Sequence, residues 1–144
     1  MIITVRGVPA PQGSKRHVGG GRMVEMSKAV GPWREAVRAE TQAQRNTRTF
    51  ITGTPVEVHV TFVLPRPKGH HRTGRNAHLL KPSAPPYPAG RPDLDKLARA
   101  VLDGLTAGGA WKDDSQVAVL QLAKVYAEDG EAPGCTIFVK ELGR

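Results

Sequence analysis

The chain has 144 residues and a formal net charge of +8, with 21 lysine and arginine residues against 13 aspartate and glutamate residues. This length predicts one domain with a single modest core. The only cysteine, Cys135, excludes an internal disulfide and leaves the usual zinc spacings unfilled, so we expect a small buried apolar residue there. The start of the chain lacks the apolar stretch of a signal peptide and no run approaches membrane-spanning length, which predicts a cytoplasmic protein without membrane partners.

The charge is unevenly distributed along the chain. Residues 1–92 carry 15 basic and 4 acidic side chains, a balance of +11, whereas residues 93–144 carry 6 basic and 9 acidic side chains, a balance of −3. A basic surface around an acidic focus suits a polyanion, and nucleic acid is the natural candidate. The alternative is that the positive charge only keeps a small protein soluble.

The first 22 residues predict a strand followed by a basic loop. Residues 1–8 alternate between apolar and polar side chains, as in a strand. We expect residues 9–22 to form a mobile loop. They contain Lys15, Arg16 and three consecutive glycines. This loop either contacts DNA phosphates or is a plain flexible hairpin.

The next segments predict a helix, a strand and a long connection. Residues 27–45 have helical periodicity with Ser27 as a possible cap, and residues 55–64 place five apolar side chains on one face of a strand. Residues 65–90 contain six prolines, several cations and three histidines without periodicity. Because long connections of this kind are functional or disordered, we expect a mobile basic loop that faces DNA and orders on it. The candidate DNA contacts are Lys15, Arg16, Lys68, Arg72, Arg75, Arg91 and Lys96.

Five of the six aspartates lie between residues 91 and 117. From Leu94 the apolar residues recur at spacings of three and four, which predicts one stripe of an amphipathic helix. Pro92 precedes this stripe, as is typical of helix starts, and Gly108 ends it.

Carboxylates gather around this predicted helix. Asp95, Arg99 and Asp103 are one turn apart on the flank of the stripe. Asp93 can converge on Asp95 from the incoming loop, while residues 113–114 present two further aspartates on a separate element. Carboxylate oxygens from separate elements are suitable ligands for Mg²⁺. Taken singly, each residue has a simpler explanation as a helix cap or as one half of an Arg99–Asp103 ion pair.

The whole segment resembles the central signature of the RusA-like Holliday-junction resolvases. That signature runs PDxDN, a lysine, LDAL, a short glycine-containing turn and W-x-DD-x-QV, and this chain reads PDLDK, Arg99, LDGL, TAGGA and WKDDSQV. The resemblance implies that the metal-binding residues are Asp93, Asp95 and Asp114, with Asp113 beside them.

Two substitutions separate this chain from the family signature. Lys96 replaces the usual asparagine and Arg99 replaces the catalytic lysine. Arginine can neutralise phosphate charge through a bidentate fork, but it does not readily give up a proton. If the family lysine acts only as a fixed positive charge, Arg99 can serve in its place. If that lysine acts as an acid, this protein must use water or Lys96 instead.

The resemblance implies an Mg²⁺-dependent endodeoxyribonuclease, with Mn²⁺ able to substitute, that resolves four-way DNA junctions in recombination and repair. It also implies a homodimer that makes paired nicks, encoded by a bacterium or a phage. Two alternatives stay open: a catalytically inactive protein that binds branched DNA, and a nuclease for other branched or flapped DNA.

The C-terminal residues complete the predicted fold. Residues 116–126 and 135–141 read as two strands, which we expect to form a hairpin across residues 127–134. The order of elements predicts an α+β fold over residues 1–144, with two helices packed on a small mixed sheet in a single domain.

Overall fold

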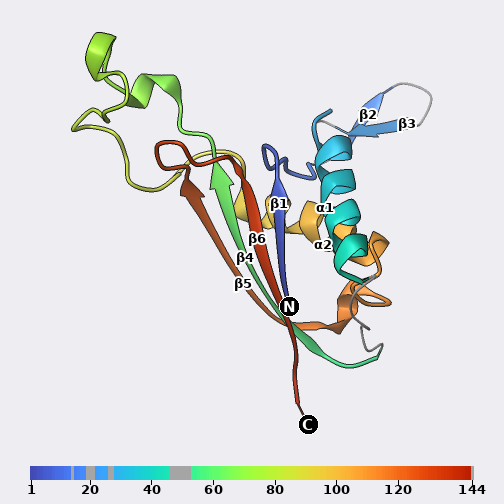
Figure 1. Cartoon of the computed structure of the whole chain (residues 1–144). Helices are drawn as coiled ribbons and strands as arrows, with labels where there is room; N and C mark the ends of the chain where they lie inside the picture. Colours follow the sequence, from blue (N-terminus) through green and yellow to red (C-terminus); the bar gives the residue numbers. More distant parts are fainter. Residues whose placement is uncertain (14, 19–21, 26–27, 46–52, 144) are drawn as a thin grey trace.

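The computed structural model describes residues 1–13, 15–18, 22–25, 28–45 and 53–143. Two helices pack on one face of a four-stranded mixed sheet (Figure 1). The predicted single α+β domain is therefore confirmed.

The sheet has the strand order β1-β6-β4-β5. β1 (Ile2–Arg6) pairs antiparallel with β6 (Gly134–Glu141), which pairs antiparallel with β4 (Val56–Leu64). β5 (Val117–Tyr126) pairs parallel with β4 and lies at the edge of the sheet. The alternating residues of β4 are buried toward the helices, as the sequence predicts.

The predicted hairpin between β5 and β6 is wrong, because β4 lies between the two strands. Val60 of β4 faces Leu122 of β5 on one side and Ile137 of β6 on the other. The connection of residues 127–133 crosses the end of β4, where the Ala127 amide donates to the Leu64 carbonyl at 2.8 Å. Each strand thus gains a central partner instead of its sequence neighbour.

A small hairpin occupies part of the predicted basic loop. β2 (Lys15–Val18) and β3 (Arg22–Glu25) pair antiparallel, so these residues form a hairpin, and its contact with DNA stays a prediction. The glycines at 19–21 and Ser27, the expected helix cap, lie outside the described residues.

Two helices cover the inner face of the sheet. α1 (Val30–Arg45) buries Trp33 and Val37, and α2 (Leu94–Ala107) buries the predicted apolar stripe. A Cβ atom at Gly104 would lie 2.8 Å from the Val37 side chain, so this glycine permits the close approach of the two helices. Within the part of the chain that the structure describes, neither helix is long and apolar enough to cross a membrane.

Cys135 lies in this core, as predicted. Its side chain is buried, and burial raises the pKa of the thiol to about 12. A thiol with so high a pKa stays protonated and unreactive at neutral pH.

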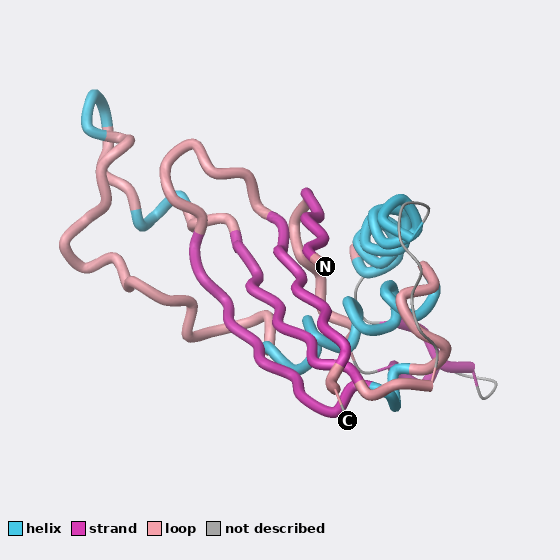
Figure 2. Tube along the Cα trace, turned by 60° about the horizontal axis from the view of Figure 1, so that its bottom comes forward, coloured by secondary structure: helices cyan, strands magenta, loops and turns pink. Residues whose placement is uncertain are grey.

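The segment between β4 and α2 extends away from the sheet (Figure 1, Figure 2). We call residues 66–86 the basic arm. It contains two 3₁₀ turns, Lys68–His70 and Gly74–Asn76, and its two sides are joined by the hydrogen bond from the Arg72 amide to the Leu79 carbonyl at 2.8 Å. The expectation that this segment is mobile and orders on DNA stays a prediction.

Candidate active site

The start of α2 is fixed by a lysine on the neighbouring strand. The ammonium group of Lys124 in β5 donates to the carbonyl oxygens of Gly90 and Pro92, at 2.6 and 3.0 Å. The Pro92 carbonyl immediately precedes Asp93, so the first carboxylate of the acidic segment is held beside the C-terminal part of β5. Sequence reasoning missed Lys124, although a single charge in an otherwise apolar strand is a usable signal.

Asp93 and Asp95 form the first acidic group, at the N-terminus of α2. Asp93 occupies the N-cap position, but its carboxylate accepts no capping hydrogen bond. Its nearest charged partner is the Lys96 ammonium group, 3.6 Å away. Both aspartates are exposed. The simple capping explanation therefore does not account for Asp93.

Asp113, in contrast, has a clear structural contact. Its carboxylate accepts a hydrogen bond from the Ser115 amide at 2.8 Å, and the Gln116 side chain completes a capping box around the 3₁₀ turn Asp114–Gln116. The hydrogen bond from Ser115 lowers the pKa of Asp113. The capping explanation thus holds for Asp113.

Asp114 lies in the turn before β5, at the opposite end of this strand from Lys124 and hence from the start of α2, and it is close enough to Asp103 to interact with its charge. Partial burial raises the pKa of Asp114, and the negative charges of Asp113 and Asp103 raise it further. Asp103 is two helical turns beyond Asp95, about 12 Å along the axis. The carboxylates of one chain therefore form two groups, one at the start of α2 and one in its C-terminal half.

The arrangement of these carboxylates decides whether one chain can bind a divalent metal ion. Exposed carboxylate oxygens are suitable ligands for a hard cation such as Mg²⁺. Among the described residues, however, no group of three or more His, Cys, Asp and Glu side chains is close enough to hold a metal ion. One chain alone does not bring Asp93, Asp95 and Asp114 together.

Arg99 is exposed on α2, one turn after Asp95. The structure describes both Arg99 and Asp103 and shows no ion pair between them. The simpler explanation of Arg99 as the partner of Asp103 is therefore not observed, and its guanidinium is available to a bound phosphate.

The basic arm is anchored at its base by Arg66, which the sequence analysis did not single out. The Arg66 guanidinium donates to the Pro85 carbonyl at 2.8 Å and stacks 4.4 Å above the ring of Tyr126, the last residue of β5. His70 packs edge-on against the same ring, with 5.3 Å between ring centroids. The arm is thus tied to the end of the sheet.

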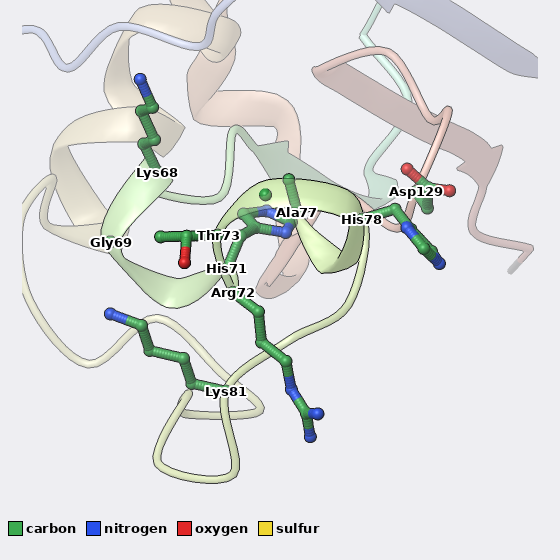
Figure 3. Close-up of a pocket in the computed structure, with 10 residues that line it drawn as sticks. Lys68, Gly69, His71, Arg72, Thr73, Ala77, His78, Lys81 and Asp129 are labelled. Carbon is green, nitrogen blue, oxygen red and sulfur yellow. The ribbon is translucent and has the colours of Figure 1, made fainter.

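The predicted DNA-binding residues lie in three places. Lys68 and Arg72 line an open pocket of about 590 Å³ on the arm, with Lys81 on the same pocket (Figure 3). Their charged ends diverge toward solvent, while Asp129 of the β5–β6 connection lies beside His78 (Figure 3). The remaining candidates are Arg75 in the second 3₁₀ turn, Arg91 and Lys96 beside Asp93, and Lys15 and Arg16 in β2, whose side chains lie outside the described residues.

A small basic α+β domain with exposed aspartates beside lysine and arginine side chains at one helix is the class of protein that we expect to act on a polyanion. The comparison with known families identifies the family of this protein. Residues 5–140 match the family model described as endodeoxyribonuclease RusA, so the chain belongs to the RusA endodeoxyribonuclease family. This confirms the resemblance found in the sequence and implies endodeoxyribonuclease activity. Resolvases of this family generally depend on a divalent metal.

The chain is also similar to the Bacillus subtilis (strain 168) protein described as "Uncharacterized protein YqaN". The two are 29% identical over 145 residues, which covers 96% of this chain and 94% of that protein. The similarity therefore extends over essentially the whole domain.

Proposed function

We propose that this protein is an Mg²⁺-dependent endodeoxyribonuclease that resolves four-way DNA junctions by paired nicks in recombination and repair. The observation that carries the proposal is the uncapped, exposed Asp93 carboxylate beside Asp95, within a chain of the RusA family. Lys124 holds this pair at the end of the sheet from which the basic arm extends.

Different residues of the chain bind the metal ion, stabilise the charge on the phosphate and contact the DNA arms. Asp93, Asp95 and Asp114 would hold Mg²⁺, or Mn²⁺ in its place, with Asp113 holding the turn that carries Asp114. A divalent ion held by these carboxylates would supply positive charge at the phosphate and a polarised water. Arg99 stabilises the negative charge that develops on the scissile phosphate. The phosphates of the DNA arms are held by Lys15, Arg16, Lys68, Arg72, Arg75, Arg91 and Lys96.

The separation of Asp114 from Asp93 supports a homodimer. β5 lies at the edge of the sheet and contains one charged residue, Lys124, which is engaged with Gly90 and Pro92. Its outward edge makes no backbone hydrogen bond with the described residues. Long apolar edge strands are normally covered or paired, and a second copy of the same strand is a suitable partner.

A two-fold axis near the first half of β5 would pair the strand with itself in antiparallel register. Because Asp114 precedes β5 and Lys124 lies near its end, this pairing brings Asp114 of one copy toward Asp93 of the other. The dimer would thus complete each set of three aspartates and carry two sites, as paired nicks require.

The pairing of β5 can be tested through Leu120, which is 38% exposed. Leu120→Arg places two like charges near the axis and should convert the dimer to monomer in sedimentation. The control is Ile2→Arg, because Ile2 is 61% exposed on the opposite edge strand. A Leu120→Arg protein that stays dimeric would place the interface elsewhere.

The activity is tested with end-labelled four-way junctions, forks and linear duplexes, incubated with Mg²⁺ or with chelator. Paired nicks near the junction centre, absent with chelator and absent in Asp93→Asn, support the proposal. Binding without cleavage would identify the inactive branched-DNA-binding protein, which the replacement of the family lysine by Arg99 makes worth testing. Preferential cutting of forks would identify a nuclease for other branched DNA.

A further inference from the structure

An open pocket of about 550 Å³ borders Asp93. Its apolar walls come from Val8, Pro9 and Pro11 in the connection after β1 and from Ala29 just before α1. Val8 is 59% exposed, so its side chain is accessible to a ligand in the pocket. The pocket is therefore an apolar hollow directly beside the proposed metal ligand.

The rim of this pocket is charged. Arg91 and Lys96 line it together with Asp93, and the Lys96 ammonium group is 3.6 Å from the Asp93 carboxylate. Two cations beside apolar walls match a ligand that has both a flat apolar part and a phosphate. A nucleotide has both parts.

The wall of the pocket is held in place from two sides. The Gln12 amide donates to the Lys96 carbonyl at 3.0 Å, and the Gln12 side-chain oxygen accepts from Arg34 Nη1 at 3.1 Å. One bond ties the connection to α2 and the other ties it to α1. A wall tied to both helices is present before any ligand binds, which lowers the entropic cost of binding.

We propose that this pocket receives the base of a nucleotide that is unstacked next to the scissile phosphate. The inference rests on the proposed nuclease function and adds a recognition site to it. The apolar walls contact the face of the base, while Arg91 and Lys96 meet its phosphate. Unstacking costs little where bases are already poorly paired, so a branch point supplies such a base more readily than a linear duplex does. The pocket therefore favours branched substrates.

The test uses junctions in which 2-aminopurine replaces one base at successive positions around the branch point, without metal so that the DNA stays intact. The fluorescence of 2-aminopurine rises when the base leaves the stack. Wild-type protein should raise it at one position beside the branch point. Ala29→Phe should abolish this rise, because the new ring fills the pocket from an exposed position.

The same variant should slow cleavage with Mg²⁺ by about tenfold or more while junction affinity changes much less. The matched control is Ala39→Phe, since Ala39 is exposed on α1 and does not line the pocket. It should behave as wild type in both measurements.

The inference is overturned if wild-type protein raises fluorescence at no position, or if Ala29→Phe matches Ala39→Phe in both measurements. A failure of the proposed nuclease function would be detected by a different measurement, the cleavage assay. A wild-type protein that cleaves no DNA contradicts the nuclease, whereas the fluorescence measurement needs only binding and still reports on the pocket.

Discussion

The ammonium group of Lys124 donates a hydrogen bond to the carbonyl oxygen of Pro92, 3.0 Å away, immediately before Asp93. The same group binds Gly90 at 2.6 Å. The position of the first proposed metal ligand therefore depends on a residue of β5 that is not itself one of the proposed metal ligands or DNA contacts.

Lys124→Met should keep the packing of the side-chain stem and lose both hydrogen bonds. We expect the free energy of unfolding to fall by about 1.5 to 3 kcal/mol, since hydrogen bonds to charged groups contribute in this range. Cleavage should slow by up to about 100-fold, because small displacements of a reacting group have effects of this size. Single-turnover cleavage and urea unfolding measure the two effects, with Lys140→Met on the exposed end of β6 as the control. Equal cleavage rates for the two variants would contradict the positioning role.

Mixed dimers of Asp93→Asn and Asp114→Asn should recover cleavage that neither variant has alone. If each site takes Asp93 from one copy and Asp114 from the other, a mixed dimer contains one intact site. If both ligands come from the same chain, every site stays damaged. The measurement is nicking of a labelled junction after the two variants are mixed and allowed to exchange. No recovery, with exchange shown independently, would contradict the shared site.

The positions of strands and helices follow from local periodicity, whereas their pairing does not. The alternation of Val56–Leu64 and the stripe of Leu94–Ala107 predict a strand and a helix at nearly the observed bounds. The short connection after β5 is typical of a hairpin. In the structure, however, β4 forms backbone hydrogen bonds with β5 along one edge and with β6 along the other, and one of its faces is buried. Each neighbouring strand pairs with β4 because the contacts across a central strand outweigh proximity in sequence.

In the candidate site, too, local spacing predicts the neighbours within one helix but not the contacts between elements. Helical spacing places Asp95 and Arg99 one turn apart, as the structure has them. Spacing does not show that Asp114 lies near Asp103, since this depends on α2 running against the direction of β5. The spacing of the aspartates also does not distinguish Asp113 from Asp93. The Asp113 side chain accepts a capping hydrogen bond, whereas the Asp93 side chain at the N-cap position of α2 accepts none.

Arg99→Ala should lower the cleavage rate by about 100-fold or more if Arg99 stabilises charge in the transition state. The thermal midpoint should hardly change, because Arg99 is exposed and forms no ion pair with Asp103 in the structure. Arg99→Lys, which restores the family residue, should keep substantial activity. Cleavage by Arg99→Ala at the wild-type rate would remove Arg99 from the catalytic set.

The basic arm should contribute to junction binding through phosphates rather than bases. Arg75→Ala should reduce the slope of log affinity against log salt by about 1, and the triple replacement of Lys68, Arg75 and Lys81 by alanine by about 3. Arg38→Ala is the matched control, because Arg38 is an exposed arginine already paired with Glu35 at 2.6 Å. An unchanged slope in the triple variant would show that the arm does not contact the DNA backbone.

Asp114→Asn should stabilise the fold at neutral pH while it abolishes cleavage. The pKa of Asp114 is raised above its ordinary value of 3.8 by partial burial and by the charges of Asp113 and Asp103. The folded chain therefore holds this proton more tightly than the unfolded chain, and stability falls as the pH rises through the ordinary and then the raised pKa. Above both values the ionised carboxylate has a constant cost, which asparagine removes. The gain should stay below about 1 kcal/mol because the side chain is exposed and screened by solvent.

This gain should disappear below the ordinary pKa, where the wild-type carboxyl group is protonated as well. Asp113→Ala should have the opposite sign at neutral pH, since it removes the acceptor of the Ser115 amide and the pKa of Asp113 is lowered by that bond. Urea unfolding in chelator at neutral and acidic pH measures both variants without interference from metal. A destabilised Asp114→Asn at neutral pH would show that Asp114 supports the fold, and its loss of cleavage would then not identify a metal ligand.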